Sequence, residues 1–131
     1  IEKFIPGREI QAAILGDNKL GAIELKPKRK FYDYEAKYNS KAKTEHIIPV
    51  DLRKKKYNEL MSISFKVHNL LGCKGVTRSD FKYYKNKFYL LETNTQPGMT
   101  KLSLVPEICL YKGINFIKLI KLLLDDASTN K

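Results

Sequence analysis

The chain has 131 residues, 43% of them hydrophobic, which fits one compact domain with a modest core and excludes an intrinsically disordered protein. Its longest apolar stretch, near the C-terminus, is interrupted by Lys118 and Lys121 and is too short and too charged to span a bilayer. The net charge of +11 comes mostly from lysines in short clusters without an arginine, aromatic or glycine pattern, which predicts solvated faces and neither a nucleic-acid nor a membrane partner.

The first predicted element is a β-hairpin, followed by a long polar loop. The segments EIQAAILG and KLGAIEL are strand-like, and we predict that the chain turns between them at Asp17-Asn18. Residues 26–49 are polar and show no periodicity of either a helix or a strand. Loops of this length inside compact domains are often functional lids, so this segment is a candidate lid.

A helix is predicted next, over about residues 52–71. Asp51 is placed to cap its start and Gly72 to end it. Its apolar face is expected to consist of Leu60, Ile63, Val67, Leu70 and Leu71. His68 has no second ligand residue four positions further on, so we interpret it as a structural residue and not as a metal ligand.

A second hairpin and two helices complete the chain. The segments GVTRSDFKYY and FYLLETN form the hairpin. Pro106 suits the first turn of a short helix that ends at Gly113, and Asn115 can cap the last helix, where Ile114 and Leu119 can form a hydrophobic staple. This order of elements predicts an α+β fold, with an antiparallel sheet and helices packed on one face.

Polar side chains gather at the end of the second hairpin that lies away from its turn. If Asn86 is the centre of a three-residue turn, Asp80 faces Glu92 and Arg78 faces Asn94 across the two strands, all on one face. With a two-residue turn Asp80 no longer faces Glu92, although residues two apart on each strand still share a face.

Two carboxylates opposed in a sheet repel each other, so something must compensate. Arg78 is one candidate and a divalent cation is the other, because Asp, Glu and Asn oxygens together with water and phosphate oxygens suit Mg²⁺. An ion-pair network or a protonated, hydrogen-bonded carboxylate is the alternative to a metal site. Directly after this hairpin, Pro97-Gly98 fits a type II turn, whose N–H groups can receive an anion or simply connect a strand to a helix.

Six segments carry a resemblance to a known family: FIPGREI, FYDYEAKY, EHIIP, GCKGVTRSDF, FYLLETNTQPGMT and SLVPE. In order and spacing they resemble the C-terminal part of the D-alanine–D-alanine ligase family of the ATP-grasp superfamily, over residues 1 to about 127. The resemblance implies that residues 1–131 are a single domain, the second half of an ATP-grasp domain, without the N-terminal domain and the first ATP-grasp half.

The resemblance also implies a reaction. ATP phosphorylates the carboxylate of one D-alanine, and the amine of a second D-alanine attacks the acyl phosphate to give D-alanyl-D-alanine, ADP and phosphate. This carbon–nitrogen ligase reaction needs Mg²⁺, two ions in this family, with Mn²⁺ as a substitute. Its product enters the peptidoglycan of the bacterial cell wall.

Roles for individual residues follow from the same resemblance. Asp80, Glu92 and Asn94 match the magnesium ligands, and Arg78 matches the arginine that stabilises the acyl phosphate and the tetrahedral intermediate. The expected catalytic group also contains Lys37, which contacts the ATP phosphates, and Tyr38, on the same closing loop. The residues that match the nucleotide site are Glu2, Phe4, Ile5, Glu9 on the ribose, Phe31 and Lys37. Those that match the site of the second D-alanine are Gly98, Ser103 and Leu104.

The alternatives concern both the residues and the whole chain. Phe4, Ile5, Phe31 and Leu104 can also be ordinary core residues. The acceptor can be D-lactate or D-serine in another ATP-grasp carboxylate–amine ligase, and a basic nucleic-acid-binding module or a decayed gene product are further possibilities.

The cellular context is expected to be a bacterial cytoplasm. Cys73 and Cys109 lack a metal-ligand spacing and are expected to be reduced thiols. Because the chain opens with Ile1 and not with Met, we expect a segment of a longer, homodimeric enzyme, without ligase activity when isolated.

Overall fold

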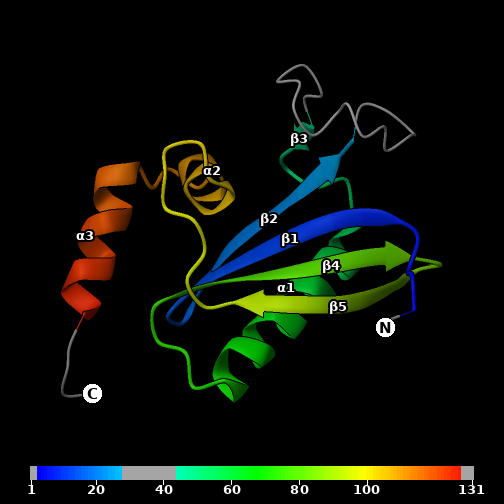
Figure 1. Ribbon diagram of the computed structural model, residues 1–131, viewed down its shortest axis with the longest axis horizontal. Coiled ribbons are helices and arrows are strands. Elements are labelled where there is room, and N and C mark those ends of the chain that lie inside the picture. Colours follow the sequence, from blue (N-terminus) through cyan, green and yellow to red (C-terminus); the bar gives the residue numbers. More distant parts are fainter. Residues whose placement is uncertain (1–2, 28–43, 128–131) are drawn as a thin grey trace.

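The computed structural model describes residues 3–27 and 44–127, which form a five-stranded antiparallel sheet and three helices (Figure 1). The strands are β1 (Arg8–Leu15), β2 (Asn18–Lys26), β3 (Glu45–Ile47), β4 (Val76–Tyr84) and β5 (Lys87–Asn94), in the order β3-β2-β1-β4-β5. The helices are α1 (Lys54–Leu70), α2 (Leu104–Tyr111) and α3 (Phe116–Asp126). This confirms the predicted α+β class. None of these helices is both long and apolar enough to cross a bilayer.

The first hairpin forms as predicted, but its turn lies one residue earlier. Leu15 pairs with Asn18, so the two turn residues are Gly16 and Asp17, not Asp17-Asn18. Gly16 has a left-handed φ of 53°, a conformation that glycine adopts without a steric penalty. Its N–H donates to the carbonyl of Gly75 at 3.0 Å, which ties this turn to the entry into β4.

The predicted long loop is partly a strand. Lys26 still belongs to β2, and β3 pairs with residues 24–26 of that strand. Three residues of polar sequence are too short to show an alternating pattern, so this edge strand was missed. Residues 28–43, which make up most of the candidate lid, lie outside the described residues.

Helices cover both faces of the sheet, which corrects the expectation that they pack on one face (Figure 1). Side chains alternate along β1, so Ile10, Ala12 and Ile14 point to one face and Ala13 and Leu15 to the other. The first set packs in a cluster with Leu60 and Met61 of α1, and the second packs in a cluster with Val105, Ile108 and Cys109 of α2 and Leu119 of α3. Because β1 is buried on both sides from Ile10 to Leu15, this part of its sequence is apolar except at Gln11.

The start and the buried face of α1 differ from the prediction. The helix begins at Lys54 after Arg53, and Asp51 is not its cap. Its buried residues are Leu60, Met61, Ser64 and His68, whereas Leu70 and Leu71 are 75% and 57% exposed. Two polar residues lie on the buried face because each has a partner: Ser64 donates to the carbonyl of Leu60, and His68 contacts Thr77.

The helix ends follow the sequence closely. Gly72 has a φ of 65°, and the N–H of Cys73 donates to the carbonyl of His68, which terminates α1 as predicted. Gly113 ends α2 in the same way.

The start of each of the two C-terminal helices is also as predicted. Pro106 lies in the first turn of α2. The side chain of Asn115 accepts from the N–H of Lys118 at 2.9 Å and caps α3. Ile114 packs against the cluster that contains Leu119, as the staple requires.

Both cysteines are free thiols, as predicted. Burial raises the pKa of the Cys109 thiol to about 11, so it remains protonated and unreactive at neutral pH.

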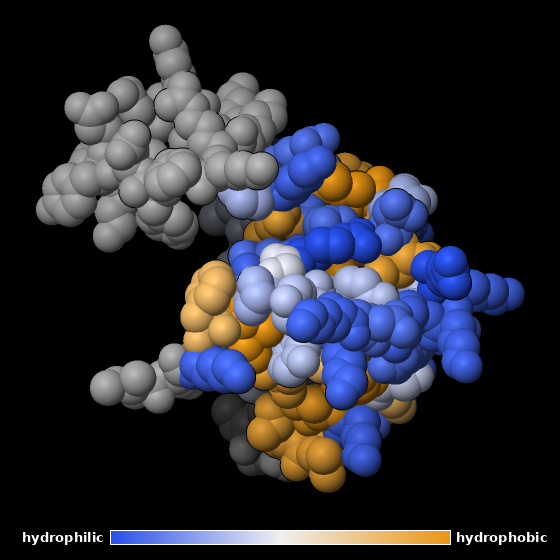
Figure 2. All heavy atoms as spheres, turned by 90° about the vertical axis from the view of Figure 1, so that its right-hand side faces the viewer, coloured by the Kyte–Doolittle hydropathy of each residue, from blue (hydrophilic) through white to orange (hydrophobic). Residues whose placement is uncertain are grey.

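The predicted solvated basic faces are present where the structure describes them. Arg53, Lys54 and Lys55 are exposed at the start of α1. Lys56 is held by Glu59 and by the carbonyl of Asn86 in the second hairpin turn, both at 2.8 Å. Figure 2 looks at this end of the molecule and shows hydrophilic side chains spread across it between apolar areas.

His68 should make stability depend on pH. The side chain is fully buried, and Nε2 has no partner among the described residues. Burial lowers the pKa of this imidazole below the usual 6.5, so the unfolded chain takes up a proton before the folded one does as the pH falls. The free energy of unfolding should therefore be largest at a pH above 6.5. It should decrease as the pH is lowered from there, by at most about 1.4 kcal/mol per pH unit.

Urea unfolding at about pH 7.5 and about pH 5.5 measures this difference. The variant His68→Gln keeps a polar side chain without the titrating ring and serves as the control. Equal pH dependence in the two proteins would contradict the prediction.

Candidate active site

The sheet face that points toward α2 and α3 is divided into an apolar and a polar part. Ala13 and Leu15, at one end of β1, pack in the cluster with these helices. Toward the other end of β1 the same face carries Gln11 and Glu9. Figure 1 shows that α2 and α3 lie toward the first of these ends, so the second forms a polar floor that none of the described helices covers.

The second hairpin brings four of the predicted site residues, Arg78, Asp80, Glu92 and Asn94, to this face of the sheet, through a turn that differs from the prediction. Its turn contains two residues, Lys85 and Asn86, with φ values of 47° and 62°, as in a type I′ turn. The predicted three-residue turn is therefore wrong. Next to the turn, Phe81 pairs with Leu90.

A β-bulge then restores the predicted pairing. Between Asp80 and Phe81 the register shifts by one residue, and Leu91 of β5 is left without a partner. Beyond the bulge Asp80 pairs with Glu92 and Arg78 pairs with Asn94, as expected. The cross-strand pairing was thus predicted correctly for a wrong reason, because two deviations from the assumed geometry cancel.

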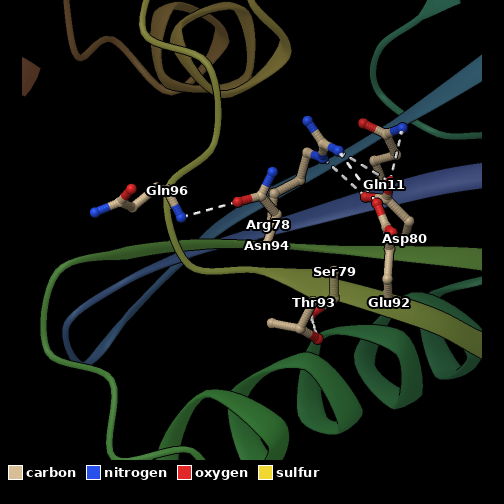
Figure 3. A network of polar contacts seen from close by, with 8 residues as sticks. All are labelled: Gln11, Arg78, Ser79, Asp80, Glu92, Thr93, Asn94 and Gln96. Carbon is tan, nitrogen blue, oxygen red and sulfur yellow. Dashed lines mark hydrogen bonds and ion pairs between the residues drawn. The ribbon is translucent and has the colours of Figure 1, made fainter.

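The four polar side chains share one face of the hairpin. Figure 3 shows Arg78, Asp80, Glu92 and Asn94 on the side of the sheet that also carries Gln11. The hydroxyls of Ser79 and Thr93, 2.9 Å apart, point to the opposite side. The prediction that these four side chains share one face is confirmed by this placement, whereas the Asn94 amide is directed toward Gln96 and away from the two carboxylates.

Arg78 compensates the two opposed carboxylates. Its Nε donates to Oδ1 of Asp80 at 2.8 Å and its Nη2 to Oδ2 at 3.0 Å, while Nη2 lies 3.9 Å from Oε1 of Glu92. The hydrogen bond with Asp80 raises the pKa of the Arg78 guanidinium, so it remains charged. Both side chains of the Arg78–Asp80 pair are less than a fifth exposed, so solvent screens this ion pair only partly.

The donor set fits a hard divalent cation when a ligand or water supplies further oxygens. Within residues 3–27 and 44–127, no group of three or more His, Cys, Asp or Glu side chains is placed to bind a metal ion. Asp80 and Glu92 provide two carboxylates, and the Glu92 side chain is 65% exposed. Asn94 Oδ1 accepts from the N–H of Gln96 at 2.9 Å and keeps a second lone pair. Mg²⁺ and Mn²⁺ accept such oxygen ligands and commonly share them with phosphate.

The residues expected at the nucleotide are only partly described. Glu9 lies two residues from Gln11 on the same face, and its carboxylate accepts from Lys82 Nζ at 3.2 Å. Phe4 is 82% exposed, which excludes core packing within the described residues, and Ile5 is half-buried. The remaining predicted residues lie outside the described part of the chain: Glu2, Phe31, Lys37 and Tyr38.

The segment expected at the second D-alanine brings two of its three residues together. A Cβ atom added to Gly98 would lie 3.0 Å from Ser103 Oγ. Ser103 Oγ accepts from the N–H of Thr100 at 3.0 Å, and Leu104 begins α2 and packs on the apolar cluster. Gly98 does not have a left-handed φ, so the type II turn predicted at Pro97-Gly98 is wrong.

Two residues of the polar floor were missed in the sequence. Gln11 Nε2 donates to Oδ2 of Asp80 at 3.4 Å, and Lys82 forms the ion pair with Glu9. Gln11 did leave a signal, because it is the one polar residue in the otherwise apolar run from Ile10 to Leu15 of a strand buried on both faces.

Comparisons with known proteins agree on one family. A sequence model described as "D-ala D-ala ligase C-terminus" matches residues 1–125. The D-alanine–D-alanine ligase of Pelagibacter ubique is 67% identical over 131 residues, which are the whole of this chain and 43% of that protein. The chain thus spans about two fifths of the length of the curated relatives it matches.

Solved structures show the same fold. The D-alanine–D-alanine ligase from Bacillus anthracis has a TM-score of 0.81 at 31% identity, covering 95% of this chain and 41% of that one. The same enzyme complexed with ATP has a TM-score of 0.80 at 30% identity, covering 95% and 40%.

The role of Arg78 in separating the carboxylates can be tested without any substrate. Arg78→Met should lower the free energy of unfolding by about 1–3 kcal/mol, because it leaves Asp80 and Glu92 opposed without a cation. Adding Asp80→Asn to this variant should restore part of the loss by removing one of the two charges. Urea unfolding in a buffer with a metal chelator measures both effects. Additive losses in the double variant would contradict the interpretation.

Proposed function

Because this chain belongs to the D-alanine–D-alanine ligase family, of which it forms the C-terminal part, we propose that it carries the magnesium–nucleotide half of an ATP-dependent ligase active site. The whole enzyme joins two D-alanines through an acyl phosphate, and its product serves bacterial peptidoglycan synthesis. The observation that carries the proposal is the direct pairing of Asp80 with Glu92, with Asn94 on the same face. The similarity to a ligase solved with ATP supports it.

The metal ligands would be Asp80, Glu92 and Asn94, with Glu92 between two ions. When bound, Mg²⁺, or Mn²⁺ in its place, neutralises the charge of the ATP phosphates. The described residues provide two carboxylates at this point, so the cation is expected to bind together with the nucleotide, whose phosphate oxygens complete the ligand set.

Arg78 would act on the charge that develops during acyl transfer. Its guanidinium is held at the floor by two hydrogen bonds to Asp80, and an anion bound above the floor would draw it away from this carboxylate. A fixed positive charge in a partly buried site stabilises the acyl phosphate and the tetrahedral intermediate.

The nucleotide and the second D-alanine would bind on opposite sides of the proposed metal site. Glu9 lies toward the N-terminal end of β1 and is expected to accept hydrogen bonds from the ribose hydroxyls. Phe4 and Ile5, which precede that strand, are expected beside the adenine. The predictions for the residues outside the described part stay as made: Glu2 and Phe31 at the nucleotide, Lys37 at the phosphates and Tyr38 in the closing loop.

At the other side, Gly98, Ser103 and Leu104 are expected to hold the second D-alanine. Ser103 Oγ contacts both the N–H and the hydroxyl of Thr100, so its orientation is fixed. A Cβ atom at Gly98 would lie 3.0 Å from this oxygen, so a side chain there would push against the Ser103 hydroxyl. D-lactate and D-serine remain alternative acceptors. We place the full-length enzyme in the bacterial cytoplasm as a homodimer.

Substitutions at the carboxylates test the proposal directly. In the full-length protein, Asp80→Asn and Glu92→Gln should each weaken Mg²⁺-dependent ATP binding by about tenfold or more, because each removes a charged oxygen ligand. Titration calorimetry with Mg²⁺ and a non-hydrolysable ATP analogue measures the effect. Ser79→Ala is the matched control, since its side chain points to the opposite face. Unchanged titration curves for both carboxylate variants would refute the magnesium site.

The isolated segment should show negligible ligase activity and weak nucleotide affinity. The relatives that it matches are more than twice as long, and the site of the first D-alanine and the other half of the nucleotide site are expected in the part that this chain does not span. A coupled assay of ADP release, with ATP, Mg²⁺ and D-alanine, compares the segment with the full-length protein. Robust turnover by the segment would show that this division of the active site is wrong.

A further inference from the structure

We propose that Gln11 is a positioning residue that fixes the Asp80 carboxylate for cation binding. This inference deepens the proposed function and rests on it, because it assigns a supporting residue to the same metal site. Neither the sequence motifs nor the comparisons assign a role to this glutamine.

The strand pairing places Gln11 directly beside Asp80. In the antiparallel pairs, Gln11 of β1 stands opposite Asp80 of β4, and Asp80 stands opposite Glu92 of β5. The three side chains therefore form a row across three strands, with Asp80 in the middle. Gln11 Nε2 donates to Oδ2 of Asp80 at 3.4 Å, and Figure 3 shows the amide standing beside that carboxylate.

Burial argues that the amide has a purpose beyond filling space. Gln11 is only 5% exposed, and its Oε1 is buried without a hydrogen-bond partner among the described residues. A buried carbonyl without a donor is unfavourable, and an apolar side chain of similar volume would avoid it. In the pairing with β2, Gln11 stands opposite Ile23, so apolar surroundings are available at this position.

The amide of Gln11 is placed to orient the Asp80 carboxylate at a cation site. Nε2 holds one oxygen of Asp80 and limits rotation of the carboxylate, which matters most when Arg78 turns toward a substrate anion and releases its own hydrogen bonds. Hydrogen-bonded neighbours that orient ligating carboxylates in this way typically change metal affinity by 10- to 100-fold.

The test is a Mn²⁺ titration of the full-length protein, followed by electron paramagnetic resonance, with a saturating non-hydrolysable ATP analogue. Gln11→Met keeps the volume and removes both polar atoms, and it should weaken Mn²⁺ binding about tenfold. If the Gln11→Met variant does not fold, Gln11→Leu is used in the same titration instead. Ser79→Ala, on the opposite face of the same hairpin, should leave Mn²⁺ affinity unchanged and controls for effects on stability.

A second arm separates this inference from the proposed function. In an Asp80→Asn background, Gln11→Met should have no further effect on Mn²⁺ affinity, because the glutamine acts through that carboxylate. Equal Mn²⁺ affinity of Gln11→Met and the unmodified protein, with Asp80→Asn impaired, would overturn the positioning role alone. Unimpaired Mn²⁺ binding by Asp80→Asn would overturn the metal site itself and this inference with it.

Discussion

Two carboxylates that face each other across adjacent strands are the constraint on which the polar floor depends. The backbone pairing of β4 and β5 places Asp80 directly opposite Glu92, so the Cα atoms of these residues cannot separate without breaking the hairpin. The repulsion has to be offset by a positive charge in the immediate neighbourhood. Arg78 supplies it by binding both oxygens of Asp80, with one nitrogen also within 4 Å of Glu92. The same arrangement makes this end of the hairpin ready to accept a cation.

The rest of the fold keeps this floor rigid and open. β1 is the central strand and is covered by α1 on one face and by α2 and α3 on the other. The helices on the site face contact the end of β1 that carries Ala13 and Leu15, whereas Glu9 and Gln11 lie toward its other end and Arg78 stands level with Ala13. An apolar cluster and a polar floor can therefore share one face of one sheet. Gln11, on the face of β1 that carries Ala13, marks the change from one to the other.

Features that depend on a few neighbouring residues could be predicted from the sequence, and features that depend on distant contacts could not. Gly72, Gly113 and Asn115 set helix ends through local backbone geometry, and each acts as predicted. The prediction of the buried face of α1 was wrong because His68 is buried through its contact with Thr77 of β4, and the periodicity of the sequence cannot reveal that contact. The bulge at Leu91 was missed for the same reason, although the pairing of Asp80 with Glu92 was correct. The roles at the site came from the family resemblance, since hard ligands on one face are compatible with an ion pair as well as with a metal.

The ion pair and the proposed metal site compete for the same oxygens, and this competition has a consequence for binding. Arg78 engages both oxygens of Asp80, so a cation that binds Asp80 lies close to the guanidinium and is repelled by its positive charge. The cation affinity is therefore lowered by the free energy needed to move the guanidinium away from Asp80. This free energy is smallest when an anion is present to form an ion pair with Arg78. A nucleotide phosphate or an acyl phosphate is such an anion. Cation and anion binding are therefore expected to favour each other at this site, because each provides a partner for a charge that the other displaces.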